Sequence, residues 1–197
     1  MKSTAKAQLE PRKLSSDERL VALCLKGDQQ AWADLIDKYK NLIYSIPIKL
    51  GMYDDASDIF QSVCVELLSD LPKLRERKAL PKWLMQVCYH KCIEHRKRAK
   101  KQVPLEDEDH ECSRADTTLP LPEEFFAQLQ REQMVRDVVG SLPARCGQLV
   151  RMLFYEMPPR PYQQVAQELG IAAGSIGFIR GRCLTRVKKQ LEKMGFQ

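Results

Sequence analysis

The sequence predicts an all-α protein in which two small helical domains are joined by an acidic flexible linker, with a helix-turn-helix in the C-terminal domain. Apolar residues recur every three or four positions over most of the chain, as they do in amphipathic helices. No stretch alternates polar and apolar residues as a half-buried strand does. Residues 103–125 carry eight acidic side chains, one basic side chain and no apolar periodicity, and such a composition is typical of a linker.

These features divide the chain into a disordered tail (1–13), an N-terminal domain (14–102), the linker (103–125) and a C-terminal domain (126–197). Residues 1–102 hold 20 basic and 13 acidic side chains, and residues 126–197 hold 11 and 5. Basic blocks of this kind indicate a nucleic-acid partner, although solvated helix faces have the same composition. No apolar run approaches the roughly 18 residues of a membrane span, and the N-terminus lacks the apolar core of a secretory signal. We therefore expect a cytoplasmic protein without membrane insertion.

The periodicity predicts four helices in the N-terminal domain. The first begins at a serine cap near residue 15 and ends before Gly27 and Asp28. The second follows the apolar stripe of Ala31, Leu35, Tyr39, Ile43 and Ile46. A third, capped by Asp54 or Asp55, has a stripe of Ile59, Val63, Leu67 and Leu71. After an irregular basic segment between Pro72 and Pro81, a fourth helix turns Trp83, Val87 and Ile93 inward.

Four more helices are expected in the C-terminal domain. One spans residues 125–139 and ends at Gly140. The next is capped by Ser141 with Pro143 in its first turn. A short helix ends at Gly170, and the last begins near Ser175 and stops at Gly195.

The last two helices have helix-turn-helix spacing, in which the second helix enters the major groove of DNA. Small Ala166 allows close approach of the helices, and Gly170 supplies the positive φ of a sharp turn. The wedge between the helices is filled by Val165, Leu169, Ile171, Ile176 and Ile179. An ordinary helical hairpin is the alternative. A phosphate-binding loop is excluded, because the glycines follow a helix rather than a strand and do not match GxGxxG or a P-loop.

On the last helix, a rotation of about 100° per residue turns Ile176, Ile179, Cys183 and Val187 inward. Gly174, Phe178, Gly181, Arg182 and Thr185 face outward, with Ser175 and Gly177 at the flanks. Gly177 and Gly181 each cost about 0.5–1 kcal/mol relative to Ala, which a structural helix would not repay. A DNA-reading helix would gain close backbone approach. Arg182 suits guanine or phosphate, Phe178 suits a thymine methyl group, and Arg180, Arg186, Lys188 and Lys189 suit phosphates.

The seven cysteines are odd in number and include no CxxC pair, so we expect free thiols. The cluster of Cys88, His90, Cys92 and His95 leaves two interpretations open. Cys88, Cys92 and His95 would share one helix face as zinc ligands, whereas buried core cysteines beside a basic helix are the commoner arrangement. We expect neither a bound metal nor a cofactor.

Taken together, these features resemble the bacterial RNA polymerase sigma factors of the extracytoplasmic-function type. The resemblance covers roughly residues 15–100 and 128–194. The segment DASDIFQSVCVELLSDLPKL is similar to the family's polymerase-binding helix, with the D-x-x-Q pattern at Asp58 and Gln61. The segment KALPKWLMQVCYHKCIEHRKR resembles the promoter-melting and −10-reading segment. Residues 141–191 resemble the fourth region, which reads the −35 element.

The resemblance implies a non-catalytic protein that directs promoter-specific initiation with core RNA polymerase as its partner. It implies a core-binding set of Asp58, Gln61, Ser62 and Val65. It implies a −10 DNA-binding set of Arg75, Arg77, Lys78, Trp83, His90, Lys91, Glu94, Arg96 and Lys97, although Trp83 is equally well explained as core. It implies a −35 DNA-binding set of Ser175, Gly177, Phe178, Arg180, Gly181, Arg182 and Arg186. An anti-sigma factor is a further implied partner.

Some residues depart from the family pattern. Ser62 stands where the family often has an acidic residue, and His90 and Glu94 stand where it often has Asn and Asp. The last helix opens with Gly177, Phe178 and Ile179 instead of Lys or Arg. These departures affect the promoter sequence rather than the class. The rival function is a conventional helix-turn-helix regulator whose N-terminal domain senses a ligand or dimerises. An enzyme is disfavoured because the sequence holds no nucleophile–base set and no paired carboxylates on a shared face.

Overall fold

The computed structural model describes residues 17–101 and 121–196, and every regular element within them is helical. The prediction of an all-α protein is therefore confirmed. The described residues fall into two compact units, Ser15–Gln130 and Arg131–Gln197, and one helix, α5 (Glu123–Gly140), crosses the division. The predicted tail and most of the predicted linker lie outside the described residues. No helix in the described ranges has the length and hydropathy needed to cross a membrane.

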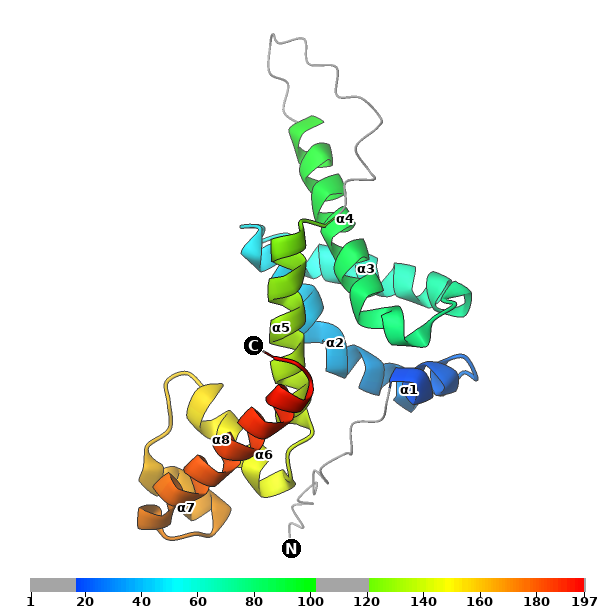
Figure 1. Cartoon of the computed structure of the whole chain (residues 1–197). Coiled ribbons are helices and arrows are strands. Elements are labelled where there is room, and N and C mark those ends of the chain that lie inside the picture. The colour runs from blue at the N-terminus through cyan, green and yellow to red at the C-terminus, as the bar shows by residue number, and fades with distance from the viewer. Residues whose placement is uncertain (1–16, 102–120, 197) are drawn as a thin grey trace, which may run out of the picture. The chain divides into compact units, whose positions relative to one another are not determined.

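The first unit is built on four helices, α1 (Asp17–Cys24), α2 (Gln29–Lys49), α3 (Ala56–Asp70) and α4 (Leu80–Lys101) (Figure 1). α1 packs on α2, and α4 packs along both α2 and α3. α2 begins directly after Asp28, because the Asp28 carboxylate accepts hydrogen bonds from the backbone N–H groups of Gln30 and Ala31. Asp55 stands at the start of α3 but makes no side-chain capping bond there.

The core of this unit uses the predicted stripes of α2 and α3. Every predicted inward residue of these helices is buried, from Ala31 to Ile46 and from Ile59 to Leu71. The inward face of α4 differs in part from the prediction. Val87 is buried as predicted, but Trp83 and Ile93 are only partly buried, and the other buried residues are Leu80, Leu84, Met85, Cys88 and Cys92. Because α4 begins at Leu80, its inward stripe starts three residues before Trp83. Buried Leu121 and Leu129, before and within α5, complete the core.

The segment between α3 and α4 is more ordered than predicted. It contains two short 3₁₀ turns, η1 (Leu71–Lys73) and η2 (Arg77–Ala79). Leu71 is buried and ties the first turn to the core, while Arg75, Arg77 and Lys78 are exposed. The segment is thus a basic loop that buried Leu71 holds against the core.

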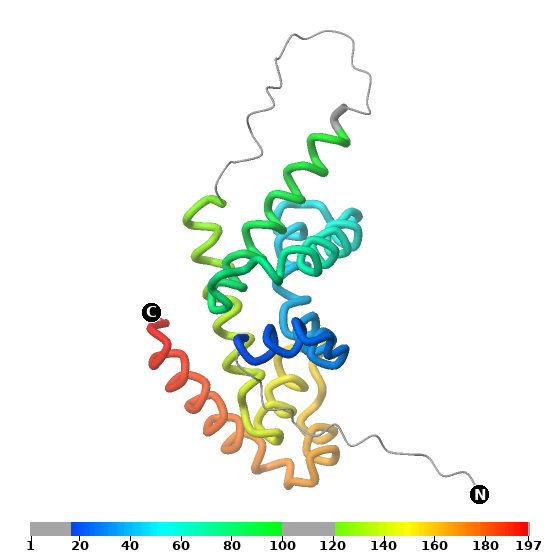
Figure 2. Tube along the Cα trace, turned by 90° about the vertical axis from the view of Figure 1, so that its right-hand side faces the viewer, coloured from blue at the N-terminus to red at the C-terminus, as the bar shows by residue number. Residues whose placement is uncertain are grey.

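The second unit contains the rest of α5, then α6 (Ala144–Phe154), α7 (Tyr162–Leu169), the 3₁₀ turn η4 (Ala173–Ser175) and α8 (Ile176–Lys193) (Figure 2). Ser141 does not cap α6, so that prediction is wrong. Its hydroxyl donates to the Val138 carbonyl at the end of α5, and Pro143 precedes the first helical residue. The ring of Pro143 disfavours helical backbone at the preceding residue, Leu142. The start of α6 is therefore delayed to Ala144.

The turn between α7 and α8 has the predicted geometry. Gly170 adopts φ 62° and ψ 42°, the left-handed conformation that glycine tolerates best. The N–H of Ile171 then reaches back to the Ala166 carbonyl at 2.9 Å. Val165, Ala166 and Ile176 are buried in the wedge between the helices, with Leu169, Ile171 and Ile179 partly buried beside them.

Candidate functional site

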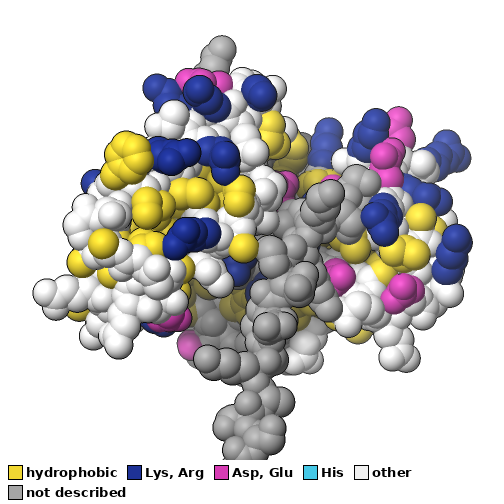
Figure 3. All heavy atoms as spheres, turned by 90° about the horizontal axis from the view of Figure 1, so that it is seen from below, with side chains coloured by type: hydrophobic (Ala, Val, Ile, Leu, Met, Phe, Trp, Pro, Cys, Tyr) yellow, Lys and Arg dark blue, Asp and Glu magenta, His cyan; other side chains and the backbone are white. Residues whose placement is uncertain are grey.

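The outward face of α8 is the first candidate surface. The predicted −35 residues Ser175, Gly177, Phe178, Arg180, Gly181, Arg182 and Arg186 are all exposed, and Phe178 exposes 70% of its area. A shallow hollow of about 800 Å³ runs along this face between Gly177 and Lys193. Lys and Arg side chains lie beside exposed hydrophobic ones on the protein surface in Figure 3. A face of this kind offers cations, an aromatic ring and bare backbone together.

Side chains on this face are held in place by local contacts. The Arg182 guanidinium lies over the Phe178 ring, 5.7 Å from its centroid. Arg180 donates to the Tyr162 hydroxyl at 2.7 Å, which links α8 to the first turn of α7. Tyr162 was absent from the predicted set, because nothing in its local sequence signals a contact 18 residues away.

The glycines of α8 have no structural explanation in packing. A Cβ atom at Gly177 or Gly181 would meet no heavy atom within 4 Å. Neither residue has a positive φ, so neither needs glycine for its backbone conformation. The helix therefore carries the entropic cost of both glycines without a benefit inside the described chain.

The opposite face of α8 is anchored to the unit's core. Ile176 and Cys183 are buried, with Ile179 and Val187 packed beside them, as the helical rotation predicted. Cys183 forms a disulfide with Cys146 of α6. The prediction of free thiols is thus wrong for this pair, because it rested on the expected compartment and not on the distance between the residues. Cys24, Cys64, Cys88 and Cys92 are free.

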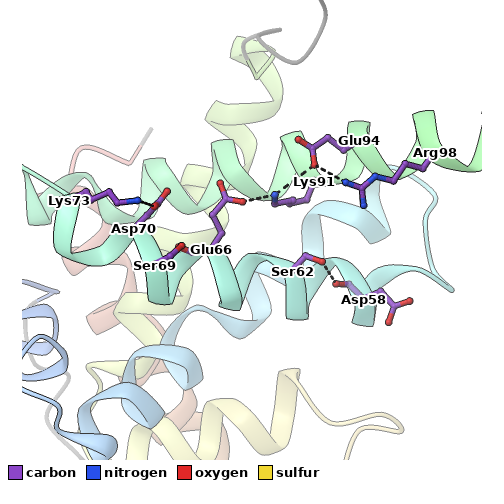
Figure 4. Close-up of polar contacts among 9 residues, drawn as sticks. All are labelled: Asp58, Ser62, Glu66, Ser69, Asp70, Lys73, Lys91, Glu94 and Arg98. Atoms are coloured by element: carbon purple, nitrogen blue, oxygen red, sulfur yellow. Dashed lines mark hydrogen bonds and ion pairs between the residues drawn. The ribbon is translucent and has the colours of Figure 1, made fainter. Parts of the chain in front are cut away.

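The second candidate surface lies where α3 faces α4. Predicted core-binding residues Asp58, Gln61, Ser62 and Val65 are exposed on α3, and all four line one hollow of about 760 Å³. Val65 exposes 67% of its area. The Ser62 hydroxyl donates to the Asp58 backbone carbonyl at 2.8 Å, and the Asp58 carboxylate points away from the helix (Figure 4). The structure thus places an acid, an amide and an apolar side chain on one face.

An ion pair closes one side of this hollow. Lys91 of α4 reaches Glu66 of α3 at 2.5 Å and Glu94 at 3.7 Å, as Figure 4 shows. Its hydrogen bond to Glu66 raises the pKa of the Lys91 ammonium group, so Lys91 stays positively charged at neutral pH. Lys91, predicted as a −10 contact, therefore lies beside the predicted core-binding set and is engaged within the protein.

The other predicted −10 residues are spread over two places. Arg75, Arg77 and Lys78 lie exposed in the loop before α4, and Lys78 comes within 3.9 Å of Glu18. On α4, Trp83 is partly buried against the core, and His90 lies 2.8 Å from the Gln86 amide. Arg96 donates to the Leu50 carbonyl at 2.9 Å, and Lys97 is partly exposed. The set therefore combines a basic loop with residues of α4, of which Arg96 faces away from the side that carries Trp83 and His90.

The Cys88, His90, Cys92 and His95 cluster does not converge on one point. Cys88 and Cys92 are buried, and the Cys88 thiol donates to the Ile43 carbonyl. His95 faces Asp55 at 3.6 Å, and His90 faces Gln86. In the part of the chain that the structure describes, no three His, Cys, Asp or Glu side chains are grouped to hold a metal ion.

The chain is similar to known proteins of one class. Residues 35–102, which include α3 and α4, match the family Sigma-70 region 2. The chain is also 22% identical over 176 residues to the ECF RNA polymerase sigma factor SigW of Bacillus subtilis (strain 168), across 86% of this chain and 93% of that protein. With the all-helical fold, these matches support an RNA polymerase sigma factor of the extracytoplasmic-function type.

Proposed function

We propose that this sigma factor binds core RNA polymerase through α3, reads the −35 element with α8, and captures −10 bases with the loop and helix around α4. The observation that carries the proposal is the composition of the exposed face of α8. Its guanidinium groups, aromatic ring and side-chain-free backbone are suited to base edges and phosphates. The helix is presented by a turn of helix-turn-helix geometry at Gly170.

The −10 assignment is supported by the charge and position of the loop before α4. The loop holds three exposed cations, Arg75, Arg77 and Lys78, and partly buried Trp83 follows it. Side chains that attract phosphate therefore lie near an aromatic ring on which a base can stack. Capture of an unstacked base needs both features. His90, Glu94 and Lys97 continue along α4 at helical spacing from Trp83, and Lys91 flanks that line. Arg96 lies on the far side of the helix, at the Leu50 carbonyl.

The core-binding assignment is supported by the exposed set on α3. Asp58 and Gln61 lie one turn apart, and Val65 follows on the same side. An apolar residue among polar side chains suits a helical partner surface. Domain roles follow from this: residues 14–102 serve core and −10 binding, and residues 126–197 serve −35 binding.

Run-off transcription with purified core polymerase over a genomic fragment library tests the proposed function. The expected result is a limited set of start sites that share −35 and −10 sequences and appear only with both proteins present. Tight operator binding by the free protein, with no change in start sites when core is added, would instead favour a conventional helix-turn-helix regulator.

An anti-sigma factor is the third proposed partner. The resemblance of this chain to extracytoplasmic-function sigma factors supports that proposal. Exposed Val65 and Leu68 on α3 are the kind of apolar surface that an inhibitor would cover. Affinity purification from the native cell is expected to recover a second protein in fixed ratio, which core polymerase displaces. Recovery of the chain only as a monomer would count against this partner.

A further inference from the structure

The disulfide between Cys146 and Cys183 occupies a defined place in the second unit. It joins α6 to α8 across 37 residues, so the closed loop contains α7 and the whole turn. Cys183 is buried among the residues that anchor α8, while Cys146 is only partly buried. Cys146 is therefore the more exposed residue of the two, and Cys183 the more sheltered.

α8 is a helix that benefits from such a tie. Its two interior glycines lower its stability, as argued above, and Ile176 and Cys183 are its buried residues. Cys183 follows Gly181 by two positions, so the bond holds the helix just past its weakest stretch. Without the bond, the apolar anchors of α8 are buried Ile176 and partly buried Ile179 and Val187.

The bond leaves the proposed DNA-reading face free. Phe178 and Arg182 are exposed, whereas Cys183 points into the core. The disulfide therefore does not block DNA. Its effect on binding is to order the helix, which reduces the conformational entropy that the helix would lose on DNA.

We infer that Cys146 and Cys183 form a reversible redox site whose oxidation orders α8 and thereby strengthens −35 recognition. The inference rests on the proposed function, since it assigns regulation to the same helix. A protein that works beside promoter DNA meets a reducing environment, in which disulfides are usually transient or redox-sensing. The reduced and the oxidised chain are then two functional states.

The oxidant required is a low-molecular-weight disulfide of the glutathione type. The Cys146 thiolate attacks one sulfur of that disulfide, its S–S bond breaks, and one small thiol leaves as a mixed disulfide forms. The Cys183 thiolate then attacks the Cys146 sulfur and releases the second small thiol. In total the two protein thiols lose two electrons and two protons, and the small disulfide gains both. A dithiol reductant reverses the exchange.

Three other described cysteines are poorly suited to this exchange. Burial, aided by the nearby Asp28 carboxylate, raises the pKa of the Cys24 thiol to about 11, and burial also raises the pKa of Cys64. Hydrogen bonding with Cys92, together with burial, raises the pKa of Cys88. Thiols with raised pKa values hold little thiolate at neutral pH and exchange slowly. Cys64, partly buried like Cys146, therefore supplies a matched control.

The test compares the full-length chain in oxidised glutathione and in dithiothreitol. Peptide mapping is expected to find the Cys146–Cys183 link only in the oxidised sample. Any link that involves Cys112 is counted separately. Hydrogen exchange is expected to slow at α8 amides, and the thermal transition of the second unit to rise by about 10 °C or more. Transcription with core from a promoter with an intact −35 element is expected to rise severalfold.

Variants Cys146→Ser and Cys64→Ser separate this site from general thiol oxidation. Cys146→Ser should lose the link and every redox response, whereas Cys64→Ser should keep them. The inference is overturned if the wild-type chain forms no such link, or if α8 exchange is the same in both states. If α8 responds to oxidation but transcription ignores the −35 sequence in both states, the redox ordering stands and the proposed −35 reading fails.

Discussion

Arg182 is the residue whose surroundings argue most directly for base reading. Its guanidinium is exposed yet held over the Phe178 ring, so its position is partly fixed before any ligand arrives. A pre-positioned side chain loses less rotamer freedom on binding. Arg180, by contrast, is bonded to Tyr162 at the start of α7 and suits a phosphate between the two helices.

Arg182→Ala is expected to weaken binding of holoenzyme to the preferred −35 element by about 1–3 kcal/mol and to relax specificity at one position. Competition assays with single-base variants of the −35 element measure this. Arg182→Lys keeps the charge but loses the planar fork, and should recover little of the discrimination.

Lys188→Ala is the control for Arg182. Lys188 is exposed and near Glu192, and its expected role is phosphate contact. Its replacement should weaken binding about equally on every sequence. An equally uniform loss with Arg182→Ala would move Arg182 from base reading to phosphate contact.

At the scale of elements, α8 shows which features local sequence can reveal. The inward line of Ile176, Ile179, Cys183 and Val187 follows from helical rotation alone, and the turn at Gly170 needs only one glycine in the right place. Both were predictable because they depend on residues within a few positions of each other. Partners far apart in sequence were not predictable: the bond of Cys183 to Cys146 depends on how α6 packs against α8.

The same distinction explains the missed cap at Ser141. A serine before an apolar run is a good capping signal, yet Pro143 stands between it and the helix. The chain therefore finishes α5 with the Ser141 hydroxyl and starts α6 later. On the α3 surface, the sequence predicted the four exposed residues together but missed that Lys91 is engaged by Glu66 across two helices.

Gly177→Ala and Gly181→Ala test what the glycines of α8 are for. Because an added Cβ meets open space in the free chain, each change should raise stability by about 0.5–1 kcal/mol. If the backbone approaches DNA at these positions, the same changes should weaken −35 binding. Thermal denaturation and −35 competition assays measure the two effects. Variants that gain stability and keep full affinity would remove the glycines from the interface.

Replacement of Asp58 and Gln61 together by Ala tests the role of α3. Both side chains are exposed and stand apart from the core, so the fold should persist while binding to core polymerase falls at least about tenfold, as for loss of interface contacts worth more than 1.4 kcal/mol. Co-purification with core and fluorescence titration measure it. The matched control replaces Gln30 and Asp34, a bonded amide–acid pair on α2, by Ala. Equal behaviour of the two double variants would contradict the assignment.

At the scale of the whole molecule, affinity for DNA and choice of DNA come from different sources. The chain carries a formal net charge of +6, and its basic side chains attract any duplex. In the proposed mechanism, sequence choice depends on α8 and on the loop and helix around α4 acting on one promoter. Core polymerase supplies that coupling in the proposed mechanism, since it would hold both units on the same DNA.

Salt dependence separates these two sources. If Arg180, Arg186, Lys188 and Lys189 each neutralise one phosphate, the affinity of the free chain should fall by about two orders of magnitude between 50 and 200 mM salt. This loss should be nearly equal for promoter and scrambled duplexes. Holoenzyme should still select promoters at the higher salt, because its discrimination comes from base contacts and strand opening. Filter binding across a salt series measures both, and sequence-selective binding by the free chain at 200 mM salt would show that core polymerase is not needed for selection.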